Sequence, residues 1–367
     1  MYNSKRKVLH ILGSLNVGGA ETMVMNVYRG LDQNRVQFDF LVNGLEKGYY
    51  EGEIEERHGK IYHVSRKSEC YWKYLKEMYS VVHRNSYEIT HIHSENSFLA
   101  FVDLVICKLA GTKRVVVHSH TTMDYRGGKL AKLSPHFSKI LNRCADVKVS
   151  CGSAAAIWLF GQEEGVEIIP LPVDCEKYRL AIKKQNELKQ KNDLLGCTVY
   201  AHTGSFSKVK NHKFLIEVFS ELCKINPKSH LILMGDGELR PEIEQQICDM
   251  KLQNRITLYG VVSDIDEKLA LADYFIFPSL FEGFPTAVLE AQAAGLNCFL
   301  SNTITEKVAI SDLVHFMSLK DDAKKWAHDI ALFDKNSLEK RLASNLKIAD
   351  RYDTKKVIEV FYRLYNT

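Results

Sequence analysis

Short runs of apolar, often β-branched residues alternate with helix-length segments along most of this 367-residue chain, and this alternation is the strongest constraint on its fold. Consecutive strands joined by helices form parallel sheets with helices on both faces. The sequence therefore predicts an α/β protein. The predicted strands are KVLHIL, VQFDFLV, KIYHV, EITHIH, KRVVVHS, DVKVS and EIIP in the first half, and CTVYAHTG, SHLILMG, RITLYG, YFIFPS and LNCFLS in the second.

The series is interrupted once, over the charged residues 171–193, which we interpret as a linker. The chain is long enough for two domains with a core each. We predict two Rossmann-like domains, over residues 1–172 and 173–352, with a helix at 353–367 that packs back on the first. Ligands of such sheets bind at the carboxyl ends of the strands, so we expect the site in a cleft between the domains.

Charge and cysteine content limit the class of protein. The formal net charge of +4 suits anionic small ligands or an acidic membrane surface and is too weak to indicate nucleic acid. The nine cysteines show no C-x-x-C spacing, which is typical of reduced thiols in a cytosol. No apolar run approaches the roughly 18 residues that span a bilayer, and MYNSKRKVLHILGS is better explained as a first strand than as a signal peptide. We expect a cytoplasmic protein.

The segment GSLNVGGAETM, residues 13–23, follows the first predicted strand. Gly13 and Gly18 have the spacing of a P-loop, but Gly19 and Ala20 stand where its Lys and Ser/Thr would be. A glycine turn before a helix directs free N–H groups toward an anion. A tight turn that packs helix on strand explains the same residues, and both interpretations stay open here.

A second segment, FPSLFEGFPTAVLEAQAAG, ends a predicted strand and begins a helix near Pro285. Glu282 precedes the helix and Glu290 lies eight residues later. Eight helical residues advance about 12 Å, so the two carboxylates cannot form a close acid/base pair. They suit the two ends of one elongated ligand, with the amides of residues 283–287 between them facing an anion. An ordinary exposed glutamate on a surface helix is the alternative.

Lysines and histidines supply further candidates. Lys208 and Lys210 lie in a loop between strand and helix, where they suit a diphosphate, although such lysines are also commonly just solvated. His91 and His93 share one face of a strand, and His118 and His120 share one face of another.

The histidine spacing is a poor match to zinc, because no cysteine or carboxylate with ligand spacing lies nearby. We expect His120 to reach the cleft and contact a hydroxyl. The other three histidines are also explained as hydrogen-bonded core residues.

These segments together resemble the retaining GT-B glycosyltransferases of family 4. FEGFPTAVLEAQAAGLNCFLS is similar to the family's E-x7-E signature, LNVGGAE to its glycine loop and TGSFSKVKNH to its G-R-x-x-x-x-K segment. MGDGE and ITLYGVVSDIDEKLALADYFIFPS resemble the stretch leading to the nucleotide pocket, and RYDTKKVIEVFYRLY the final helix. The resemblance covers nearly the whole chain and is strongest from Cys197 to Ser301. It suggests an exopolysaccharide, capsule or O-antigen type of transferase.

The resemblance implies a role for each matching position. Glu282 would hold hydroxyls of the donor sugar, Glu290 the ribose, Lys210 the diphosphate, and His120 would lie near the donor sugar; these make Glu282, Lys210 and His120 the implied catalytic residues. The implied donor-binding residues are Gly18, Gly19, Ser205, Gly260, Val261, Gly283, Phe284, Pro285, Thr286, Ala287 and Glu290.

Two positions depart from the family pattern. The diphosphate arginine is replaced by Ser205, which leaves the positive charge to Lys210 with Lys208. The usual Asn-Gly before the hinge Val173-Asp174 is replaced by Leu171-Pro172.

The resemblance implies a retaining, metal-independent hexosyltransferase that uses a nucleotide sugar, most simply a UDP-sugar, and a glycan or lipid-linked acceptor. It needs no cofactor, since helix N-termini and a lysine stabilise the departing diphosphate without metal. This also explains why the first glycine loop lacks the P-loop lysine, because no phosphoryl group is transferred. A non-catalytic nucleotide-sugar-binding partner of another transferase and a GT-B epimerase or phosphorylase are the alternatives.

Residues 126–148 place basic side chains around apolar ones. Such a segment in the acceptor domain predicts peripheral contact with the inner face of the plasma membrane. A solvated helix packed on its own domain explains it equally well, and Pro135 interrupts the periodicity.

Overall fold

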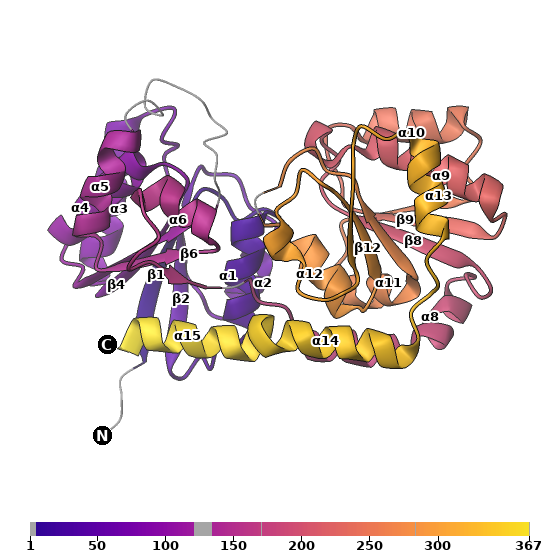
Figure 1. Ribbon diagram of the computed structural model, residues 1–367. Helices are drawn as coiled ribbons and strands as arrows, with labels where there is room; N and C mark the ends of the chain where they lie inside the picture. The colour runs from indigo at the N-terminus through magenta and orange to yellow at the C-terminus, as the bar shows by residue number, and fades with distance from the viewer. Residues whose placement is uncertain (1–4, 121–133, 170, 283, 367) are drawn as a thin grey trace. The chain divides into compact units, whose positions relative to one another are not determined.

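The computed structural model describes residues 5–120, 134–169, 171–282 and 284–366. The chain divides into two compact units, Met1–Pro172 with Thr354–Thr367, and Val173–Asp353 (Figure 1). Each contains a parallel sheet with helices on both faces, so the predicted α/β class is confirmed.

The sheet of the first unit has, within the described residues, seven parallel strands in the order β3-β2-β1-β4-β5-β6-β7. These are β1 (Arg6–Leu12), β2 (Val36–Asn43), β3 (Ile61–Val64), β4 (Ile89–Ser94), β5 (Arg114–Ser119), β6 (Val147–Ser150) and β7 (Glu167–Ile168). The helices are α1 (Gly19–Gly30), α2 (Glu51–Glu56), α3 (Tyr71–Arg84), α4 (Ser97–Leu109), α5 (Ser134–Cys144), α6 (Ser153–Phe160) and α15 (Thr354–Asn366).

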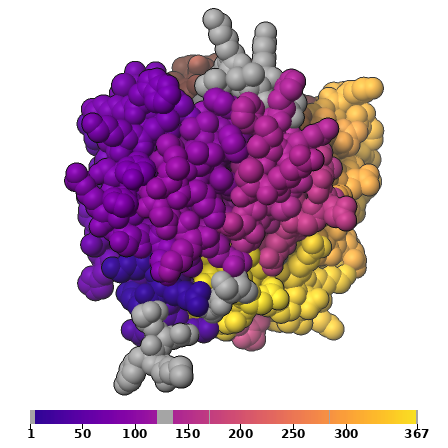
Figure 2. Space-filling model, turned by 90° about the vertical axis from the view of Figure 1, so that its left-hand side faces the viewer, coloured from indigo at the N-terminus to yellow at the C-terminus, as the bar shows by residue number. Residues whose placement is uncertain are grey.

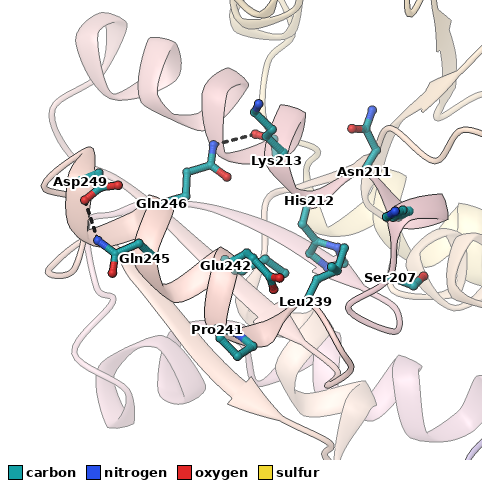
Figure 3. A pocket seen from close by; sticks show the side chains of 12 residues that line it. Ser207, Asn211, His212, Lys213, Leu239, Pro241, Glu242, Gln245, Gln246 and Asp249 are labelled. Carbon is teal, nitrogen blue, oxygen red and sulfur yellow. Dashed lines mark hydrogen bonds between the residues drawn. The ribbon is translucent and has the colours of Figure 1, made fainter.

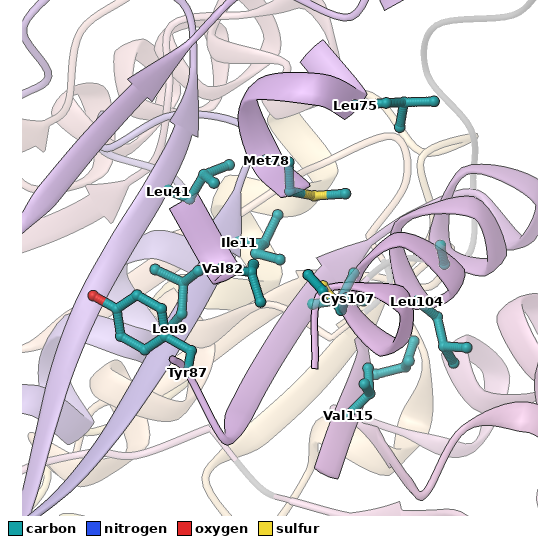
Figure 4. Close-up of a cluster of buried hydrophobic side chains, with 14 of the residues drawn as sticks. Leu9, Ile11, Leu41, Leu75, Met78, Val82, Tyr87, Leu104, Cys107 and Val115 are labelled. Atoms are coloured by element: carbon teal, nitrogen blue, oxygen red, sulfur yellow. The ribbon is translucent and has the colours of Figure 1, made fainter. Parts of the chain in front are cut away.

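Alternation along the strands gives the two faces of this sheet different partners. Leu9 and Ile11 point to one side, where they join a buried cluster with Met78 and Val82 of α3 and with Leu104 of α4 (Figure 4). A continuous apolar core therefore holds α3 to α6 on this side.

On the other side of the sheet, His10 packs against Phe38, 4.0 Å between ring centroids, and α15 adds the ring of Tyr365. Helix α15 also packs on α1, where the Asp32 N–H donates to the hydroxyl of Tyr362 over 2.6 Å. Figure 2 shows the bright yellow of α15 beside indigo residues from the start of the chain. The last helix thus covers a sheet built from the first half of the chain.

The second unit has, in its described residues, a six-stranded parallel sheet in the order β10-β9-β8-β11-β12-β13. The strands are β8 (Thr198–Thr203), β9 (Ser229–Met234), β10 (Ile256–Gly260), β11 (Tyr274–Phe277), β12 (Asn297–Ser301) and β13 (Val314–Met317). The helices are α7 (Cys175–Lys183), α8 (Gln185–Lys191), α9 (His212–Ile225), α10 (Arg240–Asp249), α11 (Ile265–Leu271), α12 (Thr286–Ala293), α13 (Ala323–Ala331) and α14 (Leu338–Tyr352).

The predicted linker is wrong. Residues 175–183 and 185–191 form α7 and α8, which pack on α11 and α14 inside the second unit. Asp174 caps α7 by accepting the Lys177 N–H, and Tyr178 is buried. Lys189 is only 6 % exposed. Its burial is possible because its Nζ lies 2.8 Å from Oδ1 of Asp273, which neutralises the charge. The charge that suggested a linker is thus partly neutralised by a residue far away in the sequence.

The basic segment is described only from residue 134 onward, so Arg126, Lys129 and Lys132 lie outside the described residues. In α5, Leu141 is buried and Phe137 packs on Phe98, with 4.8 Å between ring centroids, whereas Ile140 is 42 % exposed. Most of the described apolar face therefore packs on its own unit. In the part of the chain that the structure describes, no helix is long and apolar enough to cross a membrane.

Candidate active site

The loops at the carboxyl edge of the second sheet are joined backbone to backbone. The Gly204 N–H donates to the Met234 carbonyl over 3.0 Å, and the Gly235 N–H to the Gly260 carbonyl over 2.8 Å. Gly235 has a φ of +136°, and a Cβ there would lie 2.0 Å from the carbonyl oxygen of Gly204. Only glycine fits this close approach, so the ends of β8, β9 and β10 form one connected edge.

A short 3₁₀ turn at Lys208–Lys210 follows, and it is tied to the end of β11. Asn211 adopts the left-handed conformation with a φ of 55°, which suits asparagine. Its side-chain amide donates to the Pro278 carbonyl over 3.2 Å, and the Leu280 N–H donates to the Val209 carbonyl over 2.8 Å. These bonds bring Lys210 next to the residues that follow β11.

The structure brings two of the predicted catalytic residues together. Lys210 Nζ lies 2.6 Å from Oε1 of Glu282, and the two side chains are 18 % and 15 % exposed. The ammonium also lies 4.8 Å from the centre of the Phe277 ring, and the Lys210 stem packs over Gly204. A half-desolvated ion pair holds its charges in fixed positions. This pair can offer a cation to a phosphate and an acceptor to hydroxyl groups.

Helix α12 begins immediately after this pair, with Pro285 as its N-cap residue. Among the described residues no side chain caps its first turn, which begins with Thr286 and Ala287. The first N–H groups of a helix carry partial positive charge. The Phe284 ring stacks on Tyr352, 6.1 Å between centroids, and Gly283 lies outside the described residues.

Glu290 lies apart from the Lys210–Glu282 pair, in contact with α7. Its carboxyl group lies against the phenol of Tyr178. The Tyr178 hydroxyl is not placed well enough for a hydrogen bond to any described residue. Burial, with a smaller contribution from the nearby Asp266, raises the pKa of Glu290 to about 7. A buried carboxyl with no cation beside it keeps its proton to higher pH. Tyr178 was not predicted, because it lies in the segment interpreted as a linker.

The other predicted donor-binding positions of this unit occupy the same sheet edge. Ser205 Oγ lies 3.3 Å from the hydroxyl of Ser207, and Gly260 ends β10 with a φ of +69°. The side chain of Val261, next to it, is 48 % exposed. Their predicted contacts with a nucleotide stay predictions.

In the first unit, Gly18 is the extended N-cap residue of α1, and nothing lies within 4 Å of where a Cβ of Gly19 would be among the described residues. A Cβ at Gly18, however, would lie 2.4 Å from Oε2 of Glu21, whose other oxygen accepts from Ser14 over 3.4 Å. Burial raises the pKa of Glu21. The chain's own carboxylate therefore lies next to this turn, and the predicted contact of Gly18 and Gly19 with a nucleotide sugar stays a prediction.

The four predicted histidines lie together on the first sheet, joined by His10, which was not predicted. His120 contacts His93, with 2.7 Å between ring nitrogens, and burial lowers the pKa of His120 to about 3. His120 is therefore a neutral hydrogen-bonding group at neutral pH. Two groups of three rings have nitrogens close enough for metal ligands, namely His10, His91, His93 and His93, His118, His120.

A surface cavity of about 740 Å³ lies between the Lys208–Lys213 segment and α10 (Figure 3). Its wall includes Ser207, Asn211 and His212 on one side and Pro241 and Gln246 on the other. Lys210, Glu282 and Glu290 are not among its lining residues. The cavity therefore lies beside the candidate site and shares Lys208 with it.

Two family models match the chain. The model for Glycosyltransferase Family 4 matches residues 17–177, and the model for glycosyl transferases group 1 matches residues 183–348.

Two relatives agree with these matches. The chain is 32 % identical to "Putative glycosyltransferase EpsF" of Bacillus subtilis (strain 168), over all of this chain and 98 % of that protein. It is 30 % identical to the Escherichia coli UDP-Gal:alpha-D-GlcNAc-diphosphoundecaprenol alpha-1,3-galactosyltransferase, over 63 % of this chain and 62 % of the enzyme.

Among solved structures, Anabaena HepE in complex with UDP and glucose superposes with a TM-score of 0.77 at 18 % identity, covering 99 % of this chain and 100 % of HepE. The predicted GT-B fold is confirmed by this similarity. The chain belongs to the glycosyltransferases, with a family 4 domain in its first half and a group 1 domain in its second.

Proposed function

We propose that this glycosyltransferase moves a hexose from a UDP-sugar to a glycan or lipid-linked acceptor in cell-surface polysaccharide synthesis, with retention of configuration and without metal. The observation that carries the proposal is the Lys210–Glu282 pair, 2.6 Å apart at the carboxyl edge of the second sheet and next to the start of α12. The name of the galactosyltransferase supports a sugar donor bound to UDP and a lipid-linked acceptor.

In the proposed reaction the bond between the sugar C1 and the diphosphate oxygen breaks, and the acceptor oxygen bonds to C1 on the same face. The acceptor hydroxyl gives its proton to the departing diphosphate. Negative charge therefore grows on the diphosphate, where the Lys210 ammonium and the first N–H groups of α12 stabilise it. The chain needs no carboxylate nucleophile for this reaction.

The acidic residues hold the donor in position. Glu282 accepts hydrogen bonds from sugar hydroxyls, and its pairing with Lys210 keeps both groups fixed before the donor binds. Glu290 binds the ribose hydroxyls. His120, which is neutral, contributes a hydrogen bond to a sugar hydroxyl.

Single substitutions at the pair test the proposal. Lys210→Ala and Glu282→Ala should each lower UDP release and sugar transfer by about a hundredfold or more, as expected for lost charge stabilisation, while the circular-dichroism spectrum shows that the fold is retained. Lys224→Ala and Glu221→Ala are matched controls, because these residues form an ion pair elsewhere in the same unit. Unchanged turnover in both site variants would refute the site.

Four further measurements test the alternatives and the finer parts of the proposal. Release of UDP from a panel of UDP-sugars identifies the donor, whereas a non-catalytic binding partner releases none; the replacement of the family arginine by Ser205 motivates that alternative. A changed sugar without acceptor would indicate an epimerase. The anomeric configuration of the product by NMR tests retention, and full activity in EDTA tests metal independence.

A further inference from the structure

Five imidazole rings lie on one face of the first sheet, on the side covered by α1 and α15. They come from three adjacent strands: His10 from β1, His91 and His93 from β4, and His118 with the following His120 from β5. His10, His91 and His118 are completely buried. Polar groups buried to this degree need hydrogen-bond partners, and these rings find them in one another.

Each bond between two rings joins neighbouring strands with the same offset. His10 is opposite His91 in the strand register but bonds to His93, with 2.9 Å between ring nitrogens. His93 is opposite His118 but bonds to His120 over 2.7 Å. His91 bonds to His118 over 3.2 Å. The regular offset of two residues builds two rows across the sheet.

Ring geometry distinguishes bonds within a row from packing between rows. The bonded pairs have centroids 5.0 to 5.3 Å apart and interplanar angles of 20 to 24°. Together with the short nitrogen separations, this places the rings edge to edge, with the bond close to both ring planes. His91 and His93 are instead 4.4 Å apart, and His118 and His120 4.0 Å, without a bond between them among the described contacts. The rows therefore stack face to face.

Tyr365 of α15 connects the two rows. Its hydroxyl lies 2.7 Å from Nδ1 of His91 and 3.5 Å from Nε2 of His10. The chain of contacts runs His118, His91, Tyr365, His10, His93, His120. At one end, Nε2 of His118 has no partner among the described residues; at the other, Nδ1 of His120 takes no part in the chain.

Counting protons shows that these rings cannot choose their tautomers independently. A neutral imidazole has one N–H and one bare nitrogen, and a hydroxyl donates one hydrogen. Each link needs one hydrogen, and each inner ring uses one nitrogen in each direction. If His120 carries its hydrogen on Nε2, each of the other four rings must carry its hydrogen on Nε2 as well. If His120 carries its hydrogen on Nδ1, all five rings carry it on Nδ1.

The same geometry argues against a metal ion within the rows. A zinc ion needs the bare nitrogens of its ligands to converge on one point at roughly 2.0–2.1 Å. In each edge-to-edge pair the bare nitrogen of one ring already faces the N–H of the next. A metal would have to displace these hydrogens and turn the rings.

We propose that His10, His91, His93, His118 and Tyr365 form a tautomer relay that fixes whether Nδ1 of His120 offers a hydrogen-bond donor or an acceptor at the carboxyl edge of the sheet. They are positioning residues that act through His120. The relay itself is a property of the first unit, whereas its consequence for a sugar hydroxyl rests on the proposed function of His120.

Nitrogen NMR of protein labelled with ¹⁵N in the histidine rings tests the relay without any activity measurement. The couplings of each ring nitrogen to the ring C–H protons report the tautomer. All five rings should be neutral and of one tautomer from about pH 6 to about pH 8, where a free histidine titrates. Two different tautomers among the five, or a cationic ring at pH 7, would overturn the proposal. Stoichiometric, tight binding of Zn²⁺ that shifts these nitrogens would overturn it too.

Tyr365→Phe removes only the hydroxyl that joins the rows. We expect His10, His93 and His120, which then lose their link to His91 and His118, to become mixtures of tautomers while the melting temperature falls little. Tyr362→Phe is the matched control, since it removes another hydroxyl of α15 that lies outside the relay. An unchanged set of tautomers in Tyr365→Phe would contradict the relay.

Kinetics then test the consequence separately. Loss of one hydrogen bond to the sugar corresponds to about a fivefold change in kcat/KM, so Tyr365→Phe should lower transfer by about that factor and Tyr362→Phe should not. If the tautomers change but transfer does not, the relay stands and its proposed link to the ligand is refuted. If Lys210→Ala leaves transfer unchanged, the proposed function is refuted, and the NMR result still decides on the relay.

Discussion

The two units each contain a prominent set of polar side chains that is stabilised in a different way. The first places five neutral imidazoles in mutual hydrogen bonds, and burial holds the pKa of His10 and His120 at about 3. The second pairs opposite charges, buried in the case of Lys189 with Asp273 and partly exposed in the case of Lys210 with Glu282. Neutral groups need only matching hydrogens, whereas charges need a fixed partner of opposite sign. The two units should therefore respond differently to substitution and to pH.

The largest effect is expected where a charge loses its partner. Asp273 accepts from Lys189 and from the Val199 N–H, and Asp273→Ala leaves a buried ammonium without its carboxylate. We expect a loss of roughly 3 to 5 kcal/mol in the free energy of unfolding, measured by urea denaturation. Asp249→Ala, which removes a surface carboxylate bonded to Gln245, is the control. A loss below about 1 kcal/mol would show that the charged core is no more sensitive than the neutral one.

Glu290 sharpens the comparison, because it is a carboxyl of the second unit without a cation beside it. Its pKa of about 7 in the folded protein exceeds its ordinary value of 4.5, so the folded state keeps a proton that the unfolded chain loses. The contribution of Glu290 to the free energy of unfolding is therefore fully present below about pH 4.5 and is lost as the pH rises through about 7. The unsubstituted protein should lose roughly 2 to 3 kcal/mol in its free energy of unfolding over this pH range through Glu290, and Glu290→Gln should not show this loss. Parallel stability curves for both proteins would contradict the assignment.

The histidine rows should show the opposite pH dependence. Burial lowers the pKa of His118 well below its ordinary value of 6.5. Below that pH the unfolded chain therefore binds a proton at His118 that the folded state does not bind. The contribution of His118 to the free energy of unfolding is therefore present above pH 6.5 and is lost as the pH falls below this value. His118→Leu has one such ring fewer. Between about pH 7 and pH 5 its free energy of unfolding should therefore fall by about 2 kcal/mol less than that of the unsubstituted protein. Chemical denaturation at the two pH values measures this difference, with exposed His328→Leu as the control.

The smallest effect concerns Tyr178, which lies against Glu290. Tyr178→Phe keeps the ring and removes the hydroxyl, so we expect donor affinity to fall by no more than about fivefold, the value of one hydrogen bond. Calorimetric titration with UDP measures it. Equal affinity in Tyr178→Phe and a larger loss in Glu290→Gln would show that the carboxyl alone contacts the ribose.

Local patterns predicted most of the fold. Alternating strand and helix signals correctly indicated two parallel sheets. The linker at 171–193 was wrong because Lys189 is buried only through Asp273, a contact across more than eighty residues that no local pattern contains. The short strand β13, VHFM, was missed for lack of a clear alternation.

The candidate site could be predicted by residue but not by contact. The Lys210–Glu282 pair depends on the left-handed Asn211 and on the bond between Leu280 and Val209, which become visible only in three dimensions. His10 was missed because a single histidine in a strand has no meaning until the register with β4 is known. The sequence also gave no sign that Glu21 lies over Gly18.

Tyr365 has a consequence for biosynthesis. The strands that carry the five rings leave the ribosome early, whereas α15 emerges only after the whole second unit has been made. Until then the histidine face of the nascent first sheet lacks α15, one of the two helices that cover it, and its two rows lack the hydroxyl that links them. The amino-terminal half of the polypeptide therefore completes its packing only when α15 has been made, and a ribosome stalled before residue 354 would expose part of one sheet face to chaperones.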